Sequence, residues 1–361
     1  MDLLERARAE GTPLIDGDKA IFVWHGDQPP LLSGDFAVGD WRSTPLEFEH
    51  AGTNLWSRAV SFPRDAYVEY GLFSSLEPER RVLDPFNRRR VWNGMGQYNH
   101  WFTMPDYRRS PFVRAGRRFQ RGLVTRHWLP NQGLFVGRRR LVYLYQPPVD
   151  AVVPLVVVWD GPDYLRRAKL TTIVDNLIAQ QRIRPIALAL IDNGGKARFI
   201  EYMANDVTLA FVLEQVLPLA RAHLRLIDID EQPGSHGVLG ASMGGLMALY
   251  AGFRLPNIFG HVISQSGAFQ FDYGGNEMPI FTMVRHTERA PLTIWQNCGL
   301  LEWLLYGNRR MHQALRESGR SVTYYEFSAG HNYRAWSDCV HRGLINAFGL
   351  KWDETGEQPP T

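Results

Sequence analysis

The sequence predicts an α/β protein: a domain with a mostly parallel central sheet, preceded by a small all-β sandwich. Three observations carry this prediction. Residues 17–78 contain short segments rich in aromatic and β-branched residues, separated by Gly, Pro and Asp. From about residue 120, near-continuous apolar strands alternate with helical patterns, which is typical of a parallel sheet covered on both faces. The length of 361 residues favours two domains over one core.

In the first domain we expect strands in AIFVWHG (20–26), LWSRAVSFP (55–63) and AYVEYGLF (66–73), with glycine turns in LLSGDFAVGDW (31–41). Pro, Asn and Gly recur through 83–107, which predicts a loop-rich connector. The predicted boundaries are 1–105 for the sandwich with its connector, 106–352 for the second domain, and 353–361 for a polar tail.

In the second domain, strands are expected at 140–148, 154–161, 185–192, 237–242, 261–267, 291–299 and 321–327. Helical spacing of apolar residues predicts helices at 170–183, 205–224 and 303–318. We find neither repeats nor low-complexity segments. Strands alternating with helices in this way predict a largely parallel sheet.

Composition bounds the function classes. Hydrophobic residues make up 45% and charged residues 21%, an ordinary globular balance that argues against disorder. Nothing approaches 18 consecutive apolar residues, so we expect no membrane partner. The first residues, MDLLERARAE, lack an apolar signal core, so we expect a cytoplasmic location. Cys298 and Cys339 are too few for a disulfide framework, and we expect two free thiols.

The net charge of +3 is unevenly spread. Between Arg80 and Arg140 there are 15 Arg against two acidic residues, Asp84 and Asp106. This excess is either a solvated connector whose acidic partners lie elsewhere in the fold, or a field that attracts an anionic ligand. The Arg residues form no recognisable nucleic-acid module, so we expect no nucleic-acid partner.

A serine lies among three glycines in GVLGASMGGLMALYAG (237–252). Val238-Leu239 ends a predicted buried strand, Gly240-x-Ser242-x-Gly244 forms the turn, and a run of helix formers follows. This is the context of a nucleophile elbow, in which a strained serine projects from the top of the sheet. We therefore expect Ser242 to be a nucleophile, with the amide of Met243 pointing at a developing oxyanion.

A serine hydroxyl needs a base, and the base needs an orienting acid. In folds that carry a nucleophile elbow, the three catalytic residues follow one another along the chain in the order serine, acid, histidine. Of the five histidines after Ser242, only His331 follows a predicted strand at its carboxyl end; the others are His261, His286, His312 and His341. Glu302, after the strand PLTIWQN, is the natural acid, against the alternatives Glu288, Glu317, Glu326, Asp272 and Glu277.

The second oxyanion donor should come from the loop WDGPDYL (159–165) after an early strand. Pro162 has no N–H, so either Gly161 or Asp163 supplies the amide, with Gly161 preferred. Asp160 is expected to shape this turn.

The ordered stretches of the second domain are LVVVWDGPDY, IDNGGKARFIEYMAND, GASMGGLMALYAG, CGLLEWLLYGNRRMHQAL and YYEFSAGHNYRAW. Together they resemble the enterochelin esterase-like branch of the putative-esterase (esterase D-like) α/β-hydrolase family. SGDFAVGDW and LDPFN resemble the immunoglobulin-like, early-set N-terminal domain of the same enzymes. The resemblance covers nearly the whole chain, and its motifs are specific in combination.

The resemblance implies serine-dependent ester hydrolysis, in the best-known members of the seryl lactone of a catecholate siderophore. Applied to this sequence, the resemblance implies that Ser242 is the nucleophile, His331 the base and Glu302 the acid of the triad. The family's Asp-Gly-Gln becomes Asp-Gly-Pro here, and its Gly-Gly-His-Asp becomes Ala-Gly-His-Asn at 329–332. The second change removes a carboxylate beside the base.

For several other positions the sequence leaves two roles open. Arg198 and Glu201 match a family motif and form either a structural ion pair or, through Arg198, a contact to a substrate anion or carbonyl. Asp163 is a further candidate for substrate contact. Trp303, Tyr333 and Trp336 either line an aromatic acyl pocket or pack in the core, and Phe36, Trp41 and Trp92 either form a sugar platform or fill the sandwich and the domain interface.

The leading hypothesis is a carboxylic ester hydrolase that works through an acyl-enzyme, without metal or cofactor. Its substrate is a small ester, anionic or aromatic, such as a catecholate siderophore. The alternatives are a feruloyl- or acetyl-type esterase on decorated saccharides, an acyltransferase, and a binding protein that kept the fold. The sequence leaves the oligomeric state open, a homo-oligomer included.

Overall fold

The computed structural model describes residues 2–37, 41, 44–77, 80–116, 119–270, 277–288 and 291–350. The predicted tail at 353–361 and the alternative acid Asp272 lie outside these residues. Contacts divide the chain into two units. The first unit contains Met1–Arg109 together with two segments from far along the chain, Gly299–Leu305 and Glu326–Ala335. The second unit contains the rest.

The first unit is an all-β sandwich, as predicted. One antiparallel sheet has the order β1-β2-β5-β4 and the other the order β3-β6-β9-β8, with β7 paired to β6. Apolar side chains that alternate along β2 and β6 meet between the sheets, where Phe22, Val68, Tyr70 and Phe102 are almost fully buried. Helix α1 (Leu3–Glu10) precedes strands β1 (Leu14–Asp16), β2 (Lys19–His25), β3 (Leu31–Gly34), β4 (Glu49–Gly52), β5 (Leu55–Ser61), β6 (Tyr67–Phe73) and β7 (Arg81–Val82).

The prediction that 83–107 is only a connector is wrong. Strands β8 (Arg90–Trp92) and β9 (Tyr98–Thr103) lie inside it, and β9 pairs with β6 along Tyr67–Tyr70. The Asn, Gly and Pro residues that suggested a loop lie between and around these strands. Local composition marked the turns, whereas the partner strand of β9 lies about thirty residues upstream, where a local pattern does not reach.

The second unit carries an eight-stranded sheet of order β10-β11-β13-β12-β14-β15-β16-β17. The pairs from β13 through β16 are parallel, whereas β10 and β11 run antiparallel at one edge. The strands are β10 (Leu123–Pro130), β11 (Arg139–Gln146), β12 (Leu155–Val158), β13 (Ala187–Ile191), β14 (His236–Ala241), β15 (Phe259–Gln265), β16 (Thr293–Gly299) and β17 (Val322–Phe327). The mostly parallel sheet predicted from the sequence is confirmed.

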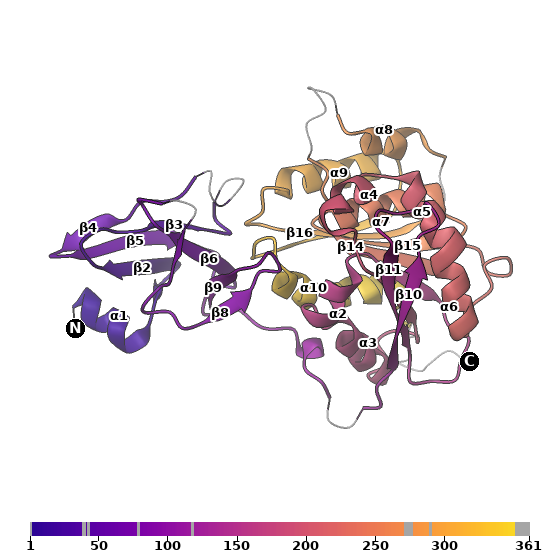
Figure 1. The fold of residues 1–361 in the computed structure, drawn as a ribbon, viewed down its shortest axis with the longest axis horizontal. Helices are drawn as coiled ribbons and strands as arrows, with labels where there is room; N and C mark the ends of the chain where they lie inside the picture. Colours follow the sequence, from indigo (N-terminus) through magenta and orange to yellow (C-terminus); the bar gives the residue numbers. More distant parts are fainter. Residues whose placement is uncertain are drawn as a thin grey trace. The chain divides into compact units, whose positions relative to one another are not determined.

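Helices cover both faces of this sheet (Figure 1): α2, α3 and α10 lie on one side, and the remaining helices, including α7 and α9, on the other. They are α2 (Gly161–Arg166), α3 (Leu170–Ala179), α4 (Arg198–Tyr202), α5 (Asp206–Phe211), α6 (Leu217–His223), α7 (Met243–Arg254), α8 (Pro279–His286), α9 (Leu305–Glu317) and α10 (Tyr333–Phe348). The helix predicted at 205–224 contains a π-helical turn, Val212–Val216.

No single helix among the described residues has the length and apolarity to cross a membrane, although the bent pair Gly195–Tyr202 and Asp206–His223, at 105°, passes by length and composition.

The strand order reverses between two neighbouring strands. From β12 the chain first moves to β13 on one side and then returns to β14 on the other side of β12. Ligands of open α/β sheets bind at such a switch point, at the carboxyl ends of the strands. The residues at these two carboxyl ends are therefore the first place to look for chemistry, and they are Trp159-Asp160-Gly161 and Ala241-Ser242.

Candidate active site

Ser242 is the single residue between the end of β14 and the start of α7. Its backbone has φ +59° and ψ −124°, a conformation that is strained for a residue with a side chain. The strain is held in place on both sides: the Ser242 N–H donates to Gln265 O at 2.9 Å, and its carbonyl accepts from the Ala268 N–H at 3.0 Å. The geometry is that of a nucleophile elbow.

The glycines around the serine are required by close approach. A Cβ at Gly240 would lie 2.3 Å from the carbonyl oxygen of Gly244, so the two ends of the turn can cross only without side chains. Met243 is the first residue of α7, and the first amides of a helix have no partner within the helix. The Met243 amide is therefore suited to stabilise an oxyanion.

The turn after β12 contains the two candidates for the second oxyanion donor, Gly161 and Asp163. A Cβ at Gly161 would lie 2.3 Å from the backbone of Leu190, which explains a glycine at the start of α2. Between the two amides that the sequence left open, that of Asp163 already donates to the Asp160 carbonyl at 3.0 Å. Gly161, at the first helical position, is therefore the better candidate for an oxyanion donor. The Asp163 carboxylate pairs with Arg167 at 3.2 Å.

Arg198 lies beside this turn, but its partner is not the predicted one. It makes two bonds of 2.7 Å to the carboxylate of Asp160, which is 1% exposed, and a longer contact of 3.4 Å to the Ala241 carbonyl. Glu201 instead forms a buried two-bond pair with Arg140, at 2.7 and 2.8 Å. The proposed Arg198–Glu201 pair is therefore wrong.

Both arginines hold separate segments of the chain together through ion pairs. Arg198 joins the residue before Gly161 to the residue before Ser242, so it ties together the two turns at the switch point. Arg140 comes from the arginine-rich stretch and, as expected for that stretch, pairs with an acidic residue elsewhere in the fold, although Arg140 is buried and not solvated. In an interior of low dielectric, two-bond pairs of this kind fix geometry more strongly than single contacts do.

The predicted base and acid lie together in the first unit. His331 Nδ1 is 2.6 Å from Glu302 Oε2, and Glu302 Oε1 accepts from the Gly299 N–H at 2.9 Å. The Glu302 side chain is fully buried, whereas that of His331 is 17% exposed. A carboxylate on Nδ1 keeps the proton there and leaves Nε2 as the basic nitrogen.

The three aromatic candidates divide. The Trp303 ring lies 4.6 Å from the His331 ring and is 44% exposed, so it can contact a molecule bound next to His331. Tyr333 is buried at the start of α10. Trp336 is also buried, and its indole N–H donates to Ser266 Oγ at 2.9 Å, which makes it a core residue.

Of the residues weighed as a sugar platform, Phe36 packs into the sandwich core against Phe22 and Phe62. The Trp41 ring lies 5.4 Å from the Arg81 guanidinium. Trp92 is 44% exposed and contacts Tyr98.

A hollow that the sequence did not predict lies at the carboxyl edge of the sheet in the second unit. Its volume is about 220 Å³, and its wall begins at Phe269, the residue after Ala268, whose amide binds the Ser242 carbonyl. An ion pair of 2.5 Å between Arg310 and Glu277 lies on its rim. The lining residues are Phe269, Gln270, Glu277, Met278, Phe281, Tyr306, Gly307 and Arg310. In the sequence, Phe281 and Tyr306 were indistinguishable from ordinary helix residues.

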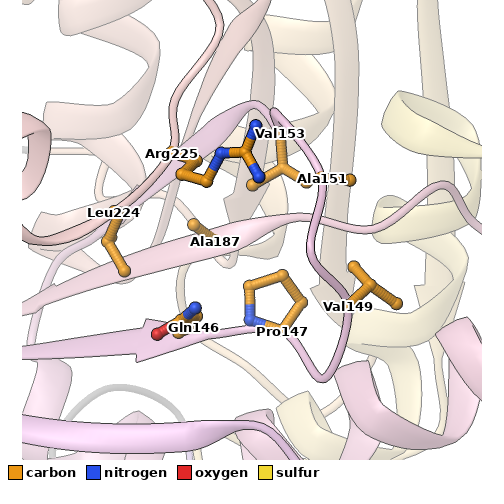
Figure 2. A pocket seen from close by; sticks show the side chains of 8 residues that line it. All are labelled: Gln146, Pro147, Val149, Ala151, Val153, Ala187, Leu224 and Arg225. Carbon is orange, nitrogen blue, oxygen red and sulfur yellow. The ribbon is translucent and has the colours of Figure 1, made fainter.

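Two other hollows lie at the opposite edge. Figure 2 shows the smaller one, of about 10 Å³, lined in part by Val153 and Ala187 at the amino ends of β12 and β13. That volume holds about one water molecule. A wider hollow of about 400 Å³ shares Gln146, Pro147 and Val149 with it. Both are at the edge away from the Ser242 turn, so we assign neither to catalysis.

Both cysteines are buried thiols, as predicted. Across the described ranges, no group of three or more His, Cys, Asp or Glu side chains could hold a metal ion.

Comparisons with known proteins agree with this geometry. The Iron(III) enterobactin esterase of Dickeya dadantii (strain 3937) is 28% identical, covering 97% of this chain and 92% of its own length. The enterobactin esterase of Shigella flexneri, crystallised in the presence of enterobactin, superposes with a TM-score of 0.74 at 20% identity, covering 91% and 92% of the two chains. A ferulic acid esterase of Anaeromyces mucronatus covers 66% of this chain and 94% of its own, with a TM-score of 0.56 at 16% identity. At these identities the two solved structures show the fold alone.

The sheet whose strand order reverses, and the strained serine between strand and helix, define an α/β-hydrolase fold, which follows an all-β sandwich in the chain. The Putative esterase family matches residues 135–346, more than half of the chain. The chain belongs to this family and is a carboxylic ester hydrolase that resembles the iron-siderophore esterases.

Proposed function

We propose that the protein is a serine esterase that hydrolyses catecholate-siderophore esters through an acyl-enzyme on Ser242. The observation that carries the proposal is the strained Ser242 turn at the switch point of the sheet, with φ +59°. The His331–Glu302 pair, at 2.6 Å, supplies an oriented base of the kind that such a serine needs.

In the proposed mechanism, Ser242 Oγ attacks the ester carbonyl carbon while its proton passes to His331 Nε2. The tetrahedral oxyanion accepts hydrogen bonds from the amides of Met243 and Gly161. Collapse breaks the carbon–oxygen bond to the alcohol, which takes the proton from His331. A water molecule, deprotonated by His331, then attacks the acyl carbonyl, and the acid leaves as Ser242 recovers its proton. Glu302 holds the imidazolium throughout.

The substrate class is supported by three observations. Relatives that align over nearly the whole chain are named as Iron(III) enterobactin and Iron(III) salmochelin esterases. Three aromatic residues line the hollow near the serine turn: Tyr306 is exposed, whereas Phe269 and Phe281 are almost fully buried in its wall. Arg310, whose guanidinium lies 5.7 Å from the Tyr306 ring, shares the Glu277 carboxylate with Arg285, so these two arginines and one glutamate carry a net charge of +1. An aromatic, anionic acyl group such as a dihydroxybenzoyl amide suits such a lining.

The test is hydrolysis of an ester panel by the wild type, Ser242→Ala and the control Ser318→Ala; the Ser318 hydroxyl, just after the end of α9, donates to Leu315 O in the last turn of that helix. The panel contains p-nitrophenyl butyrate, methyl ferulate, and the iron-free and iron-loaded catecholate trilactones. We expect the wild type to prefer a trilactone and Ser242→Ala to lose at least about 10³-fold. A fluorophosphonate probe should label the wild type and the control only.

Two outcomes would contradict the proposal. Equal activity of the wild type and Ser242→Ala would exclude the serine mechanism. A strong preference for methyl ferulate would leave the mechanism intact and replace the substrate class. Addition of an alcohol acceptor to the same assay distinguishes a transferase from a hydrolase, because a transferase would yield a new ester in place of the free acid.

A further inference from the structure

The loops that carry the base and the acid are built into the sandwich. The Tyr67 N–H of β6 donates to Ser328 O at 3.0 Å, and Tyr67 forms an isolated parallel bridge with Ala329. Leu301, beside the acid, packs on the sandwich core, and its N–H donates to Ala329 O at 3.2 Å. The two loops are therefore bonded to each other and to the first domain.

Asp35, just after β3, contacts the base loop on both sides of His331. Its Oδ2 accepts from the Glu69 N–H at 2.8 Å and from the Asn332 side-chain amide at 3.3 Å. A Cβ at Gly330 would lie 2.1 Å from the Asp35 carboxyl carbon, so Gly330 is a glycine because Asp35 is there. Asp35 itself is 7% exposed.

Asp35 belongs to a buried group of carboxyl side chains, to which position 332 contributes an amide. Burial, then the carboxylate of Glu69, and to a lesser extent that of Glu302, raise the pKa of Asp35 well above its usual value. An aspartate at 332, which the family motif carries, would add another carboxylate to this buried group. Asn332 donates an N–H to Asp35 instead, and its Oδ1 accepts from the Ala335 N–H at 2.9 Å, at the start of α10.

We propose that Asp35 is a positioning residue for catalysis: through Asn332 and Gly330, the sandwich domain sets the place of the His331 base. The inference rests on the proposed function of His331. It gives the first domain a direct part in the hydrolysis of every ester, small ones included, beyond any contact to a large substrate. Misplacement of a catalytic group by about 1 Å costs on the order of 10²-fold in rate.

The test is a reciprocal exchange at positions 35 and 332. Asn332→Asp places two carboxyl groups together, and we expect kcat on p-nitrophenyl butyrate to fall about 10²-fold with KM within about threefold. Asp35→Asn keeps a carbonyl that accepts from Asn332, so its kcat should stay within about fivefold of the wild type. The double variant restores a donor–acceptor pair with the roles exchanged, and its kcat should recover to within about tenfold.

Asp84→Asn is the matched control. Asp84 is a buried carboxyl of the same sandwich, and its oxygens accept from Thr12, Tyr70 and the backbone amides of Phe86 and Asn87, all of which belong to the sandwich. We expect a lower Tm with kcat unchanged. If Asp84→Asn and Asn332→Asp lose kcat in proportion to their loss of Tm, Asp35 only stabilises the domain and the proposal is overturned.

A second readout separates this proposal from the proposed function. Hydrogen–deuterium exchange of residues 326–335 should rise in Asn332→Asp and return in the double variant, whether or not any ester is cleaved. Unchanged exchange in Asn332→Asp would overturn the positioning role even in an active enzyme. Inactivity of the wild type on the whole panel, with the exchange pattern as expected, would overturn the proposed function alone.

Discussion

Replacement of the acid by its amide, Glu302→Gln, is the most direct test of the base–acid pair. The substitution keeps the size of the side chain and removes its charge. In the wild type, Glu302 Oε1 accepts from the Gly299 N–H and Oε2 faces His331 Nδ1 at 2.6 Å. The amide can satisfy only one of these two donors, so either the backbone of Gly299 or the Nδ1 proton of His331 loses its acceptor.

The magnitude follows from the charge that develops in the reaction. The imidazole is neutral before the attack and carries a positive charge in the transition state, so the carboxylate acts mainly on the transition state. For charge centres about 4 Å apart in an effective dielectric constant of about 20, the lost attraction is about 4 kcal/mol. This corresponds to a decrease of about 10³-fold in kcat, with little change in KM.

The assay is steady-state hydrolysis of p-nitrophenyl butyrate from pH 6 to 9 by the wild type, Glu302→Gln and Glu317→Gln. Glu317 is an exposed carboxylate at the end of α9 that accepts from Gln313 at 2.7 Å, and it was an alternative acid by sequence. Its amide variant should keep wild-type kcat. A thermal melt of each protein checks that the variants are folded.

A folded Glu302→Gln that retains more than about a tenth of the wild-type kcat would refute this reasoning. It would mean that the carboxylate does not act on the imidazolium, and that the 2.6 Å pair has a structural role. Loss of kcat in Glu317→Gln instead would move the acid to α9.

Three further predictions concern the Arg198–Asp160 ion pair, the hollow lined by Tyr306, and the buried His236. Arg198→Lys replaces the two-bond pair with Asp160 by at most one bond and should lower kcat about 10- to 10²-fold, with the exposed-pair variant Arg254→Lys as control. Tyr306→Ala should raise KM for aromatic acyl esters about tenfold and leave that of p-nitrophenyl acetate within about threefold; equal changes for both would contradict an aromatic subsite. Burial lowers the pKa of His236 to about 4. Because the unfolded state then binds more protons than the folded state below pH 6.5, the free energy of unfolding decreases by about 3 kcal/mol as the pH falls from 6.5 to 4. His236→Asn should therefore show a smaller decrease of Tm between pH 7 and 4.5, and an equal decrease would refute this assignment.

The nucleophile half of the site could be predicted because its geometry is encoded locally. Gly240 and Gly244 permit the crossing of the turn, and the strand before and the helix after Ser242 are each legible from their own periodicity. The histidine and the acid were predicted in the same way, from single residues at the carboxyl ends of strands. The 2.6 Å contact between Glu302 and His331 accords with that placement.

The choice of partners across the fold could not be predicted. The motif RFIEY suggested that Arg198 pairs with Glu201, three residues away, but each pairs with a residue far along the chain, Asp160 and Arg140. Spacing of three residues on a helix makes a pair geometrically accessible. A buried carboxylate nearby offers a guanidinium a stronger, two-bond partner, and only the fold brings one there.

The sequence by itself determined the two-domain α/β class, the strained serine turn and the residue types suited to an acid and a base, because these depend on contacts within a few residues. The tertiary structure alone decided that β9 pairs with β6, that an aromatic hollow opens beside the serine turn, and that Asp35 packs against Gly330. Asp35 and Asn332 are 297 residues apart in the chain. Contacts of that separation depend on how whole sheets and loops pack, and local periodicity carries no record of them.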